Sequence, residues 1–535
     1  MGDRIKCKLQ KTTFALFFLL LATAAPGQQH PRDKEIHDAD TRAWWHTTES
    51  LAGDGMEGRD TGSAAYRRAA ELVAGRFRKA GLQPAGDAGS FLQPVPMREA
   101  AVDADGTSFT LVRDRGGEQP IAFLQQIAIN AAPGLPSETE APLTFRGYCG
   151  KEAMQEIDGK IVVCFGTQRQ GLPSGVERTA NARAGRARGI INVDDPYFTI
   201  EPPRWPAAYA RTVALNNANA EVAASAQAPD PLLVMRLNAE VLPSLLEGTG
   251  QDSAAILAAG GHQQALASFD LPSRLRVRLH LTQRSYSSPN VLATLPGTDP
   301  GLKNEYIVIA AHLDGYGYGT PVEGDKLYNG ALDDAAYVAL LIQFAENLHR
   351  QHRAFKRSLL FCAFTGEEKG LLGSNYFVQH PTIPIAQLAA DINLDQLRPL
   401  FPLRILTALA IDDSTLGALA RQVATDVGIE LRADAEPERN LLRRADHYPF
   451  LRAGVPAIGF IFGYDAGTDS ERRYREWYQV RYHRPQDDLT QPIDFDAAAK
   501  FNQFFYKITQ AAADIEARPA FRPNSSFAKN RERVP

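Results

Sequence analysis

The sequence predicts an α/β protein: a three-layer α/β/α sandwich with a mostly parallel central sheet, interrupted by a smaller β-rich domain. From Glu305 onward, apolar strand-like runs such as "YIVIAAHLD" and "SLLFCAFTGEE" alternate with helical stretches such as "AAYVALLIQFAENLHRQ". This alternation is typical of a parallel sheet covered by helices on both faces. From about residue 130 to 280, short β-like runs are separated by connections rich in Pro, Gly and Ala, which indicates a separate domain.

The composition bounds the class of protein. The chain has 535 residues, of which 44% are hydrophobic and 22% are charged, so it is a globular protein too long for one typical domain. A net charge of -4 and a pI near 6.3 show no basic excess that would neutralise a phosphate backbone. We therefore expect at least two domains and no nucleic-acid partner.

The first residues are typical of an export signal. Three lysines precede the apolar run from Phe14 to Leu21, and small residues follow it at positions 22–25. The run is far shorter than the roughly 20 residues that span a bilayer. We expect residues 1–25 to be a cleaved signal peptide, which predicts a periplasmic or extracellular protein with no stable membrane anchor.

The remaining segments divide the chain as follows. An amphipathic helix within "AAYRRAAELVAGRFRKAGL" opens a first part, and a final helix from about Phe495 to Ala517 closes the regular α/β region. We place the α/β sandwich domain at residues 36–125 and 285–517, the β-rich insertion at 130–280 and a flexible tail at 518–535.

The cysteines predict no thiolate metal site. Cys149, Cys164 and Cys362 would remain after export, an odd number without C-x-x-C spacing. Cys362 lies in an apolar run and is expected in the core. Whether Cys149 and Cys164 are bonded stays open, because the sequence does not give their Cα separation.

A metal site is predicted from five segments that carry a nitrogen or oxygen donor. One such residue in a loop is usually a cap or a turn former. Here all five donors suit zinc, four follow apolar strand-like segments, and ligands bind at the carboxyl ends of parallel strands. The five residues are His312, Asp333, Glu368, Asp395 and His483.

The donor set favours two zinc ions per chain. Three carboxylates compensate most of the charge of two divalent ions, and one of them must touch both ions to hold them about 3.5 to 4 Å apart. Asp314 lies two residues after His312, where its carboxylate could accept the ring N–H. Glu367, next to Glu368, is then free to act as a base, although the pair could also be the acidic start of a helix.

The blocks "YNGALDDA", "FTGEEKGLLGSNYF", "INLD" and "YHRPQDD" together resemble the co-catalytic zinc exopeptidase family, which includes secreted aminopeptidases, glutamate carboxypeptidase and glutaminyl cyclase. The resemblance covers about residues 40–100 and 285–510. It implies a bridging Asp333, one zinc site completed by His312 and Asp395, another completed by Glu368 and His483, and Glu367 as general base. The family has "DNASG" where this chain has Asp333-Asp334-Ala335-Ala336-Tyr337, so Asp334 stays a second candidate for the bridge.

The same resemblance assigns further roles. Tyr482 resembles a family tyrosine that polarises the scissile carbonyl, although it could equally be a packed aromatic residue. Asp446 and His447 lie where they would line the substrate pocket, but Asp446 could instead cap a short helix. The insertion resembles a protease-associated domain through "IDGKIVVCFG" and "ANARAGRARGIINVDDP", which implies a role in substrate access.

The predicted function is a secreted di-zinc metallo-exopeptidase acting on peptides. We favour an aminopeptidase, because acidic groups at Glu367 and Asp446 would suit an α-ammonium. The alternatives are a carboxypeptidase or dipeptidase, a glutaminyl cyclase-like transferase with a single zinc, and a catalytically silent binding protein. The complete ligand set argues against the last two. The sequence gives neither the preferred residue nor the oligomeric state.

Overall fold

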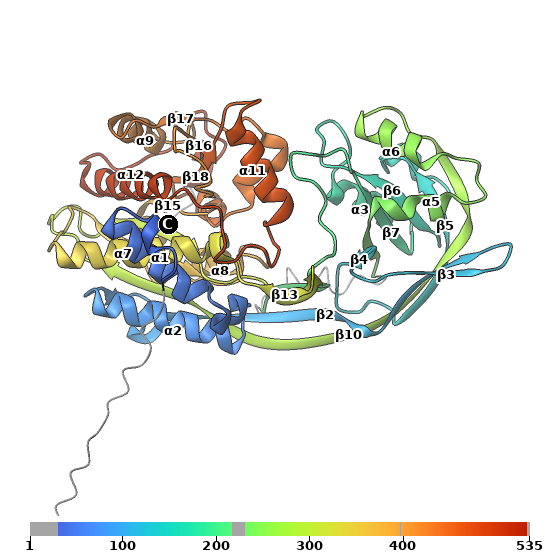
Figure 1. Cartoon of the computed structure of the whole chain (residues 1–535), viewed down its shortest axis with the longest axis horizontal. Helices are drawn as coiled ribbons and strands as arrows, with labels where there is room; N and C mark the ends of the chain where they lie inside the picture. Colours follow the sequence, from blue (N-terminus) through green and yellow to red (C-terminus); the bar gives the residue numbers. More distant parts are fainter. Residues whose placement is uncertain (1–29, 217–230, 396, 532–535) are drawn as a thin grey trace, which may run out of the picture.

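The computed structural model describes residues 30–216, 231–395 and 397–531, so the predicted export signal lies outside the described residues. Two units lie side by side and are joined by two long antiparallel strands, β2 (Leu92–Arg113) and β10 (Ser268–Leu295), which run along the bottom of Figure 1. Within the described segments, every helix is too short or too polar to cross a membrane.

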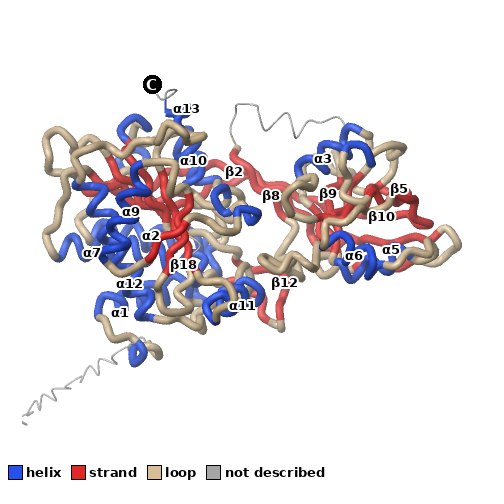
Figure 2. The backbone as a smooth tube through the Cα atoms, turned by 90° about the horizontal axis from the view of Figure 1, so that it is seen from above, coloured by secondary structure: helices blue, strands red, loops and turns tan. Residues whose placement is uncertain are grey.

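The larger unit contains the central sheet, seen from above in Figure 2. Its strand order is β17-β16-β18-β15-β11-β14-β10. The four strands from β18 to β14 run parallel, whereas β10 and β16 are antiparallel to their neighbours β14 and β18. The strands are β1 (Gln83–Pro84), β11 (Tyr306–His312), β14 (Ser358–Phe364), β15 (Leu388–Asn393), β16 (Ile405–Leu409), β17 (Glu430–Arg432), β18 (Ala457–Gly463) and a hairpin of β12 (Gly317–Val322) and β13 (Asp325–Tyr328).

Helices cover both faces of this sheet. In β11, Ile307 and Ile309 point into one hydrophobic core, whereas Val308 and Ala310 point into another. A strand that is apolar on both sides must be covered on both sides, which produces three layers and confirms the predicted fold class. The first core is covered by α1 (Ala39–Ala52), α2 (Ala64–Lys79), α7 (Ala336–Arg350), α9 (Thr415–Asp426), α11 (Asp469–Val480) and α12 (Phe495–Asp514), and the second by α8 (Leu372–Gln379) and α10 (His447–Arg452).

The smaller unit is the β-rich insertion. Its strands continue the sheet beyond β10 in the order β5-β6-β7-β9-β4, and its core also takes residues from β2 and β10, such as Phe109 and Leu275. The resemblance of this unit to a protease-associated domain stays a prediction. Its elements are β3 (Glu118–Ile121), β4 (Ile127–Ile129), β5 (Glu138–Arg146), β6 (Ile161–Gly166), α3 (Gly175–Ala184), β7 (Gly189–Asp194), β8 (Arg211–Leu215), β9 (Leu233–Leu237), α5 (Leu242–Leu246) and α6 (Ser253–Gly261).

Two local features answer questions that the sequence left open. Cys149 and Cys164 form a disulfide with a Cα separation of 5.6 Å, while Cys362 is buried and free. The chain after α12 was predicted to be flexible, yet up to α13 (Ala528–Arg531) it packs on the larger unit. Phe521 and Phe527 of this segment lie against the second core.

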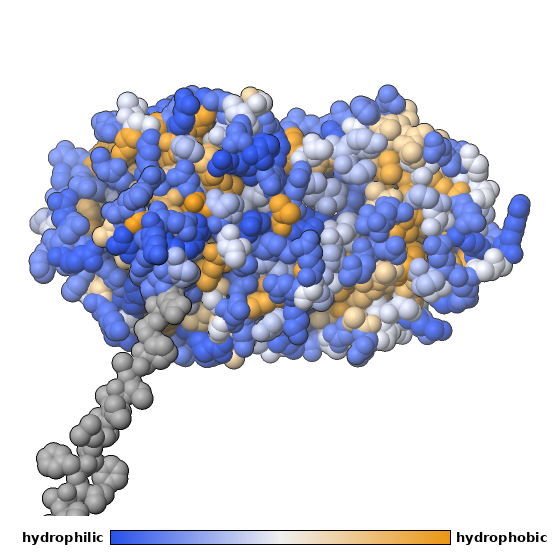
Figure 3. Space-filling view, viewed as in Figure 1, coloured by the Kyte–Doolittle hydropathy of each residue, from blue (hydrophilic) through white to orange (hydrophobic). Residues whose placement is uncertain are grey.

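The surface of the larger unit is polar where its helices face solvent. On the face drawn in Figure 3, hydrophilic side chains cover most of α1 and α11.

Candidate metal centre

The predicted ligands meet at the edge of the sheet where the parallel strands end. Parallel strands bring their carboxyl ends together, so residues far apart in the sequence become neighbours there. The structure places the five residues as follows: His312 at the end of β11, Asp333 in the turn before α7, Glu368 after β14, Asp395 after β15, and His483 after α11.

Asp333 lies between the two histidines. Its Oδ1 is 3.4 Å from Nε2 of His312, and its Oδ2 is 3.3 Å from Nε2 of His483. Oε2 of Glu368 lies 3.2 Å from the same nitrogen of His483. A carboxylate that presents one oxygen to each imidazole has the arrangement needed to bridge two ions.

Asp334 is also close to these donors. One of its oxygens lies within 4.8 Å of ligand atoms of His312 and Asp395. Its Oδ2 also accepts a hydrogen bond from the backbone N–H of His312 at 3.2 Å, and the peptide bond between Asp333 and Asp334 is cis. Because the contacts to both imidazoles come from Asp333, the geometry favours Asp333 over Asp334 as the bridging residue.

The donors fit a zinc centre. His312 is 1% exposed and Asp333 is 4% exposed, and Nε2 of the former and Oδ2 of the latter are buried without a hydrogen-bond partner. A buried polar atom without a partner is costly, and a coordinated cation would satisfy both atoms. Imidazole nitrogen and carboxylate oxygen are donors that zinc accepts. The cavity bounded by Asp333, Glu368 and His483 measures about 10 Å³, so the donors are closely gathered.

The role predicted for the Asp314 carboxylate is wrong in detail. Nδ1 of His312 hydrogen-bonds to the backbone carbonyl of Asp314 at 3.0 Å, whereas the nearest carboxylate oxygen lies 3.8 Å from that nitrogen. The carboxylate instead accepts from the backbone N–H of Glu367 at 3.0 Å and from the hydroxyl of Thr61 at 2.9 Å. The carbonyl therefore orients the ring of His312, and the carboxylate positions Glu367. The sequence could not distinguish the two because both groups belong to one residue.

Glu367 lies at the edge of the donor set. Its Oε2 is 3.9 Å from Nε2 of His312, and its side chain is 9% exposed. Burial raises the pKa of Glu367 well above its ordinary value; His312 opposes this shift, and the negative charge of Asp395 adds to it. A carboxyl group with a raised pKa beside a metal site can take up a proton and release it again.

Tyr482 is buried beside His483. The two rings are stacked with centroids 3.7 Å apart, and the hydroxyl of Tyr482 accepts a hydrogen bond from Nη2 of Arg444 at 3.2 Å. Burial raises the pKa of Tyr482 well above its ordinary value, so the hydroxyl keeps its proton and can donate it in a hydrogen bond.

Asp446 and His447 are both buried, and neither lines the small cavity of the metal centre. Asp446 accepts a hydrogen bond from the hydroxyl of Ser374, and its side chain makes no capping bond to α10. Burial raises the pKa of Asp446 to about 7 and lowers that of His447 to about 4. Their predicted contact with substrate stays a prediction.

Two residues that the sequence did not single out, Tyr316 and Asp487, hold the ligands in place. The hydroxyl of Tyr316 lies 2.8 Å from Nδ1 of His483, opposite the nitrogen that faces Asp333. The carboxylate of Asp487 accepts from the backbone N–H groups of Leu332 at 3.0 Å and Asp333 at 3.1 Å. Asp487 lies in "YHRPQDD" and Tyr316 lies just beyond "YIVIAAHLD", but nothing in the sequence indicated these contacts.

The insertion reaches the metal centre. In the loop between β7 and β8, the guanidinium of Arg204 lies 4.7 Å from the ring centroid of Tyr482. Glu201 from the same loop pairs with Arg444 through contacts of 2.7 and 3.0 Å. Because Arg444 in turn donates to the Tyr482 hydroxyl, the insertion borders the site that the larger unit carries.

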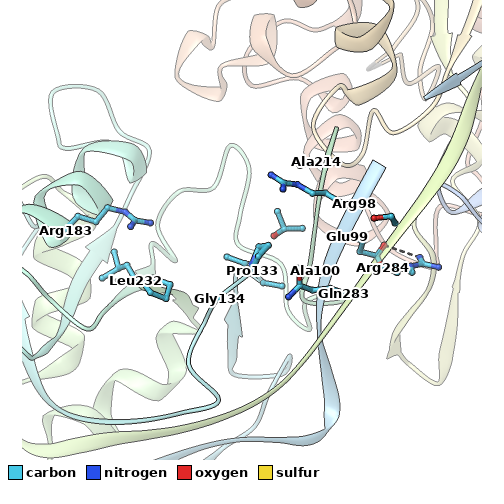
Figure 4. Close-up of a pocket in the computed structure, with 15 residues that line it drawn as sticks. Arg98, Glu99, Ala100, Pro133, Gly134, Arg183, Ala214, Leu232, Gln283 and Arg284 are labelled. Atoms are coloured by element: carbon cyan, nitrogen blue, oxygen red, sulfur yellow. Dashed lines mark hydrogen bonds and ion pairs between the residues drawn. The ribbon is translucent and has the colours of Figure 1, made fainter. Parts of the chain in front are cut away.

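A separate cavity of about 450 Å³ lies between the insertion and the long strands. Figure 4 shows its lining, with Glu99 bonded to Arg284 and with Arg98 and Arg183 on opposite sides. None of the predicted metal ligands borders this cavity, so it is distinct from the candidate metal centre although it is larger.

Comparison with a model of peptidase family M28 gives a match over residues 290–509. A probable zinc metalloprotease of Pyrenophora tritici-repentis is 30% identical over 237 residues, which are 38% of this chain and 52% of that protein. A probable leucine aminopeptidase 2 of Aspergillus fumigatus is 25% identical over 213 residues, 38% of this chain and 40% of that protein. The chain thus spans about half the length of these curated relatives or less.

A solved structure supports the fold over nearly the whole chain. The aminopeptidase from Aneurinibacillus sp. strain AM-1 superposes with a TM-score of 0.60 at 17% identity, covering 92% of this chain and 97% of that protein. At this identity, the likeness shows a shared fold.

Proposed function

We propose that this chain, which belongs to peptidase family M28 through residues 290–509, is an exported exopeptidase that removes terminal residues from peptides with two zinc ions. The observation that carries the proposal is the position of Asp333, whose two oxygens face the imidazoles of His312 and His483. Glu368 adjoins one imidazole and Asp395 the other. Two adjoining donor sets that share one carboxylate support two ions rather than one.

Glu367 is the proposed general base. Bound zinc would lower the pKa of a water molecule toward neutrality and polarise the scissile carbonyl. Glu367 takes the proton of the attacking water and delivers it to the leaving amine nitrogen. Its backbone N–H donates to the carboxylate of Asp314 at 3.0 Å. Because Asp314 follows His312 by two residues in the chain, this bond fixes the base relative to that ligand.

Tyr482 is the proposed hydrogen-bond donor to the carbonyl oxygen. Its ring is fixed by the stacked ring of His483, and Arg444 donates to its oxygen, which leaves the hydroxyl proton free to point at a substrate. A donor placed where negative charge develops lowers the barrier without needing to reorganise.

We prefer an aminopeptidase because relatives of this chain, such as the probable leucine aminopeptidase 2 of Aspergillus fumigatus, bear that name. One observation favours a carboxypeptidase or dipeptidase as second candidate. Arg204, Arg444 and Arg484 surround the site, and both Nη1 of Arg204 and Nε of Arg484 are buried without a hydrogen-bond partner. Such guanidinium groups suit a substrate carboxylate.

A substrate panel separates these candidates. The zinc-loaded chain is assayed with an aminoacyl-nitroanilide, an N-blocked peptide with a free C-terminus and a free dipeptide, each with and without chelator. Hydrolysis of the nitroanilide alone supports the aminopeptidase, and hydrolysis of the N-blocked peptide supports the carboxypeptidase. One zinc per chain together with cyclisation of glutaminyl peptides would indicate the cyclase-like alternative. Two bound zinc ions with no turnover of any substrate would contradict the enzymatic proposal.

A further inference from the structure

A second cluster of metal-ligating side chains lies at the start of the described chain. His30 and Asp33 come from the segment before α1, and His46 and Glu49 come from α1. One ligand atom each of His30, His46 and Glu49 lie within 4.8 Å of one another. Asp33 adds a fourth donor, because its Oδ1 is 2.6 Å from Nε2 of His46.

The fold brings these four residues together. Positions three apart on a helix share one face, so His46 and Glu49 point to the same side of α1. The preceding segment folds back along this face, which places Nδ1 of His30 against Oε2 of Glu49. The side chains of His30 and His46 are 21% and 29% exposed, that of Asp33 is 40% exposed and that of Glu49 is 8% exposed, so solvent reaches the cluster.

Each imidazole of the cluster is paired with one carboxylate, His30 with Glu49 and His46 with Asp33. The rings of His30 and His46 are stacked with centroids 3.5 Å apart. Glu49 is the most buried of the four side chains, so a cation beside it would offset the cost of burying its charge.

We propose that this cluster binds a divalent transition-metal ion of the zinc type, separate from the proposed catalytic pair, and that the ion clamps the N-terminal segment onto α1. Two neutral imidazoles and two carboxylates match the number, type and charge of donors for such an ion. Coordination requires the ring planes, now 16° apart, to turn away from each other, and their partial exposure leaves room for this. The ligands are His30, Asp33, His46 and Glu49.

The clamped segment also packs near the metal centre. Nη1 of Arg32 donates to the carbonyl of Gln491 at 2.7 Å, and its guanidinium lies 4.6 Å from the ring of Phe495. Nε2 of Gln491 donates to Asp487 at 2.6 Å, the residue that holds the backbone of Asp333. An ion at the cluster would thus fix a segment that supports this loop from outside.

Zinc stoichiometry tests the proposal. The full chain and a His30→Ala, His46→Ala double variant are dialysed against zinc chloride, and bound zinc is measured per chain. The variant should bind one zinc fewer than the wild type. A matched control, His262→Ala with His280→Ala, removes two exposed histidines of the insertion and should bind as much zinc as the wild type. Equal zinc content in the wild type and the cluster variant would overturn the proposal.

A second readout tests the clamp. At free zinc about ten times the dissociation constant, cleavage by trypsin after Lys34 should slow about tenfold in the wild type and remain unchanged in a Glu49→Gln variant. The same zinc effect in both proteins would overturn the clamp. Because the stoichiometry test compares two proteins with the same catalytic residues, its result does not depend on whether the proposed exopeptidase activity is correct.

Discussion

Replacing Tyr316 by Phe should lower the affinity for one of the two proposed zinc ions and leave the affinity for the other unchanged. The Tyr316 hydroxyl lies 2.8 Å from Nδ1 of His483, whose Nε2 faces Asp333 and Glu368. Without the hydroxyl, Nδ1 of His483 loses the hydrogen-bond partner that orients the imidazole as a ligand. Losing such a partner typically lowers metal affinity by about 10- to 100-fold. This corresponds to about 1.4 to 2.7 kcal/mol.

A chelator competition titration measures the two affinities separately. Tyr316→Phe should shift one of the two steps in which zinc is lost to the chelator. The packing of its ring on Tyr209, with centroids 5.5 Å apart, should persist. Tyr328→Phe is the matched control, because Tyr328 lies in the same stack but donates to the carbonyl of Thr320 at 2.8 Å instead of contacting a ligand. Wild-type affinity for both ions in Tyr316→Phe, or an equal loss in the control, would refute the reasoning.

Three further changes have defined outcomes. Glu367→Gln should lower kcat by about 10²- to 10⁴-fold with unchanged zinc content, and near-normal turnover would remove Glu367 as the base. His447, whose pKa burial lowers to about 4, stays neutral when folded but takes up a proton when unfolded below pH 6.5. Stability should therefore fall by about 3 kcal/mol between pH 6.5 and 4, and urea unfolding of His447→Gln should show a shallower dependence; identical slopes would contradict this. Replacing Cys149 and Cys164 by Ser opens a loop with a sequence separation of 15 and should cost about 3 kcal/mol, measured by urea unfolding, whereas an unchanged midpoint would count against it.

The central architecture could be predicted because its determinants are local. Strands such as β11 and β14 are apolar on both sides, and this pattern requires helices on both faces of the sheet. Since parallel strands end at one edge, residues just beyond them were expected to converge. Ligand atoms of Glu368, after β14, and of Asp395, after β15, each lie within 4.8 Å of a ligand atom of His312 at the end of β11. No knowledge of side-chain orientation was needed for this step.

Contacts that depend on orientation or on distant segments could not be predicted. The carbonyl of Asp314, rather than its carboxylate, contacts the ring of His312, and this choice is made by backbone geometry. The hydrogen bond from Tyr316 to His483 joins residues 167 positions apart. The predicted boundary between the insertion and the larger domain falls between residues 280 and 285, whereas β10 runs through both sides of it.

The strands β2 and β10, which run through both units, fix the position of the insertion beside the candidate metal centre. β10 pairs with β2 from Val291 to Ser273, which joins the two units by a long hydrogen-bonded ribbon rather than by a flexible linker. The loop that carries Glu201 is therefore held at a fixed place, where Glu201 pairs with Arg444. Burial disfavours the charge of Glu201, yet Arg444 and its neighbours lower its pKa to about 2, so the pair stays ionised at neutral pH. Removing one partner of a buried ion pair costs several kcal/mol of stability, so separating the units at this point is costly. The insertion is thus held as a fixed wall beside the candidate metal centre.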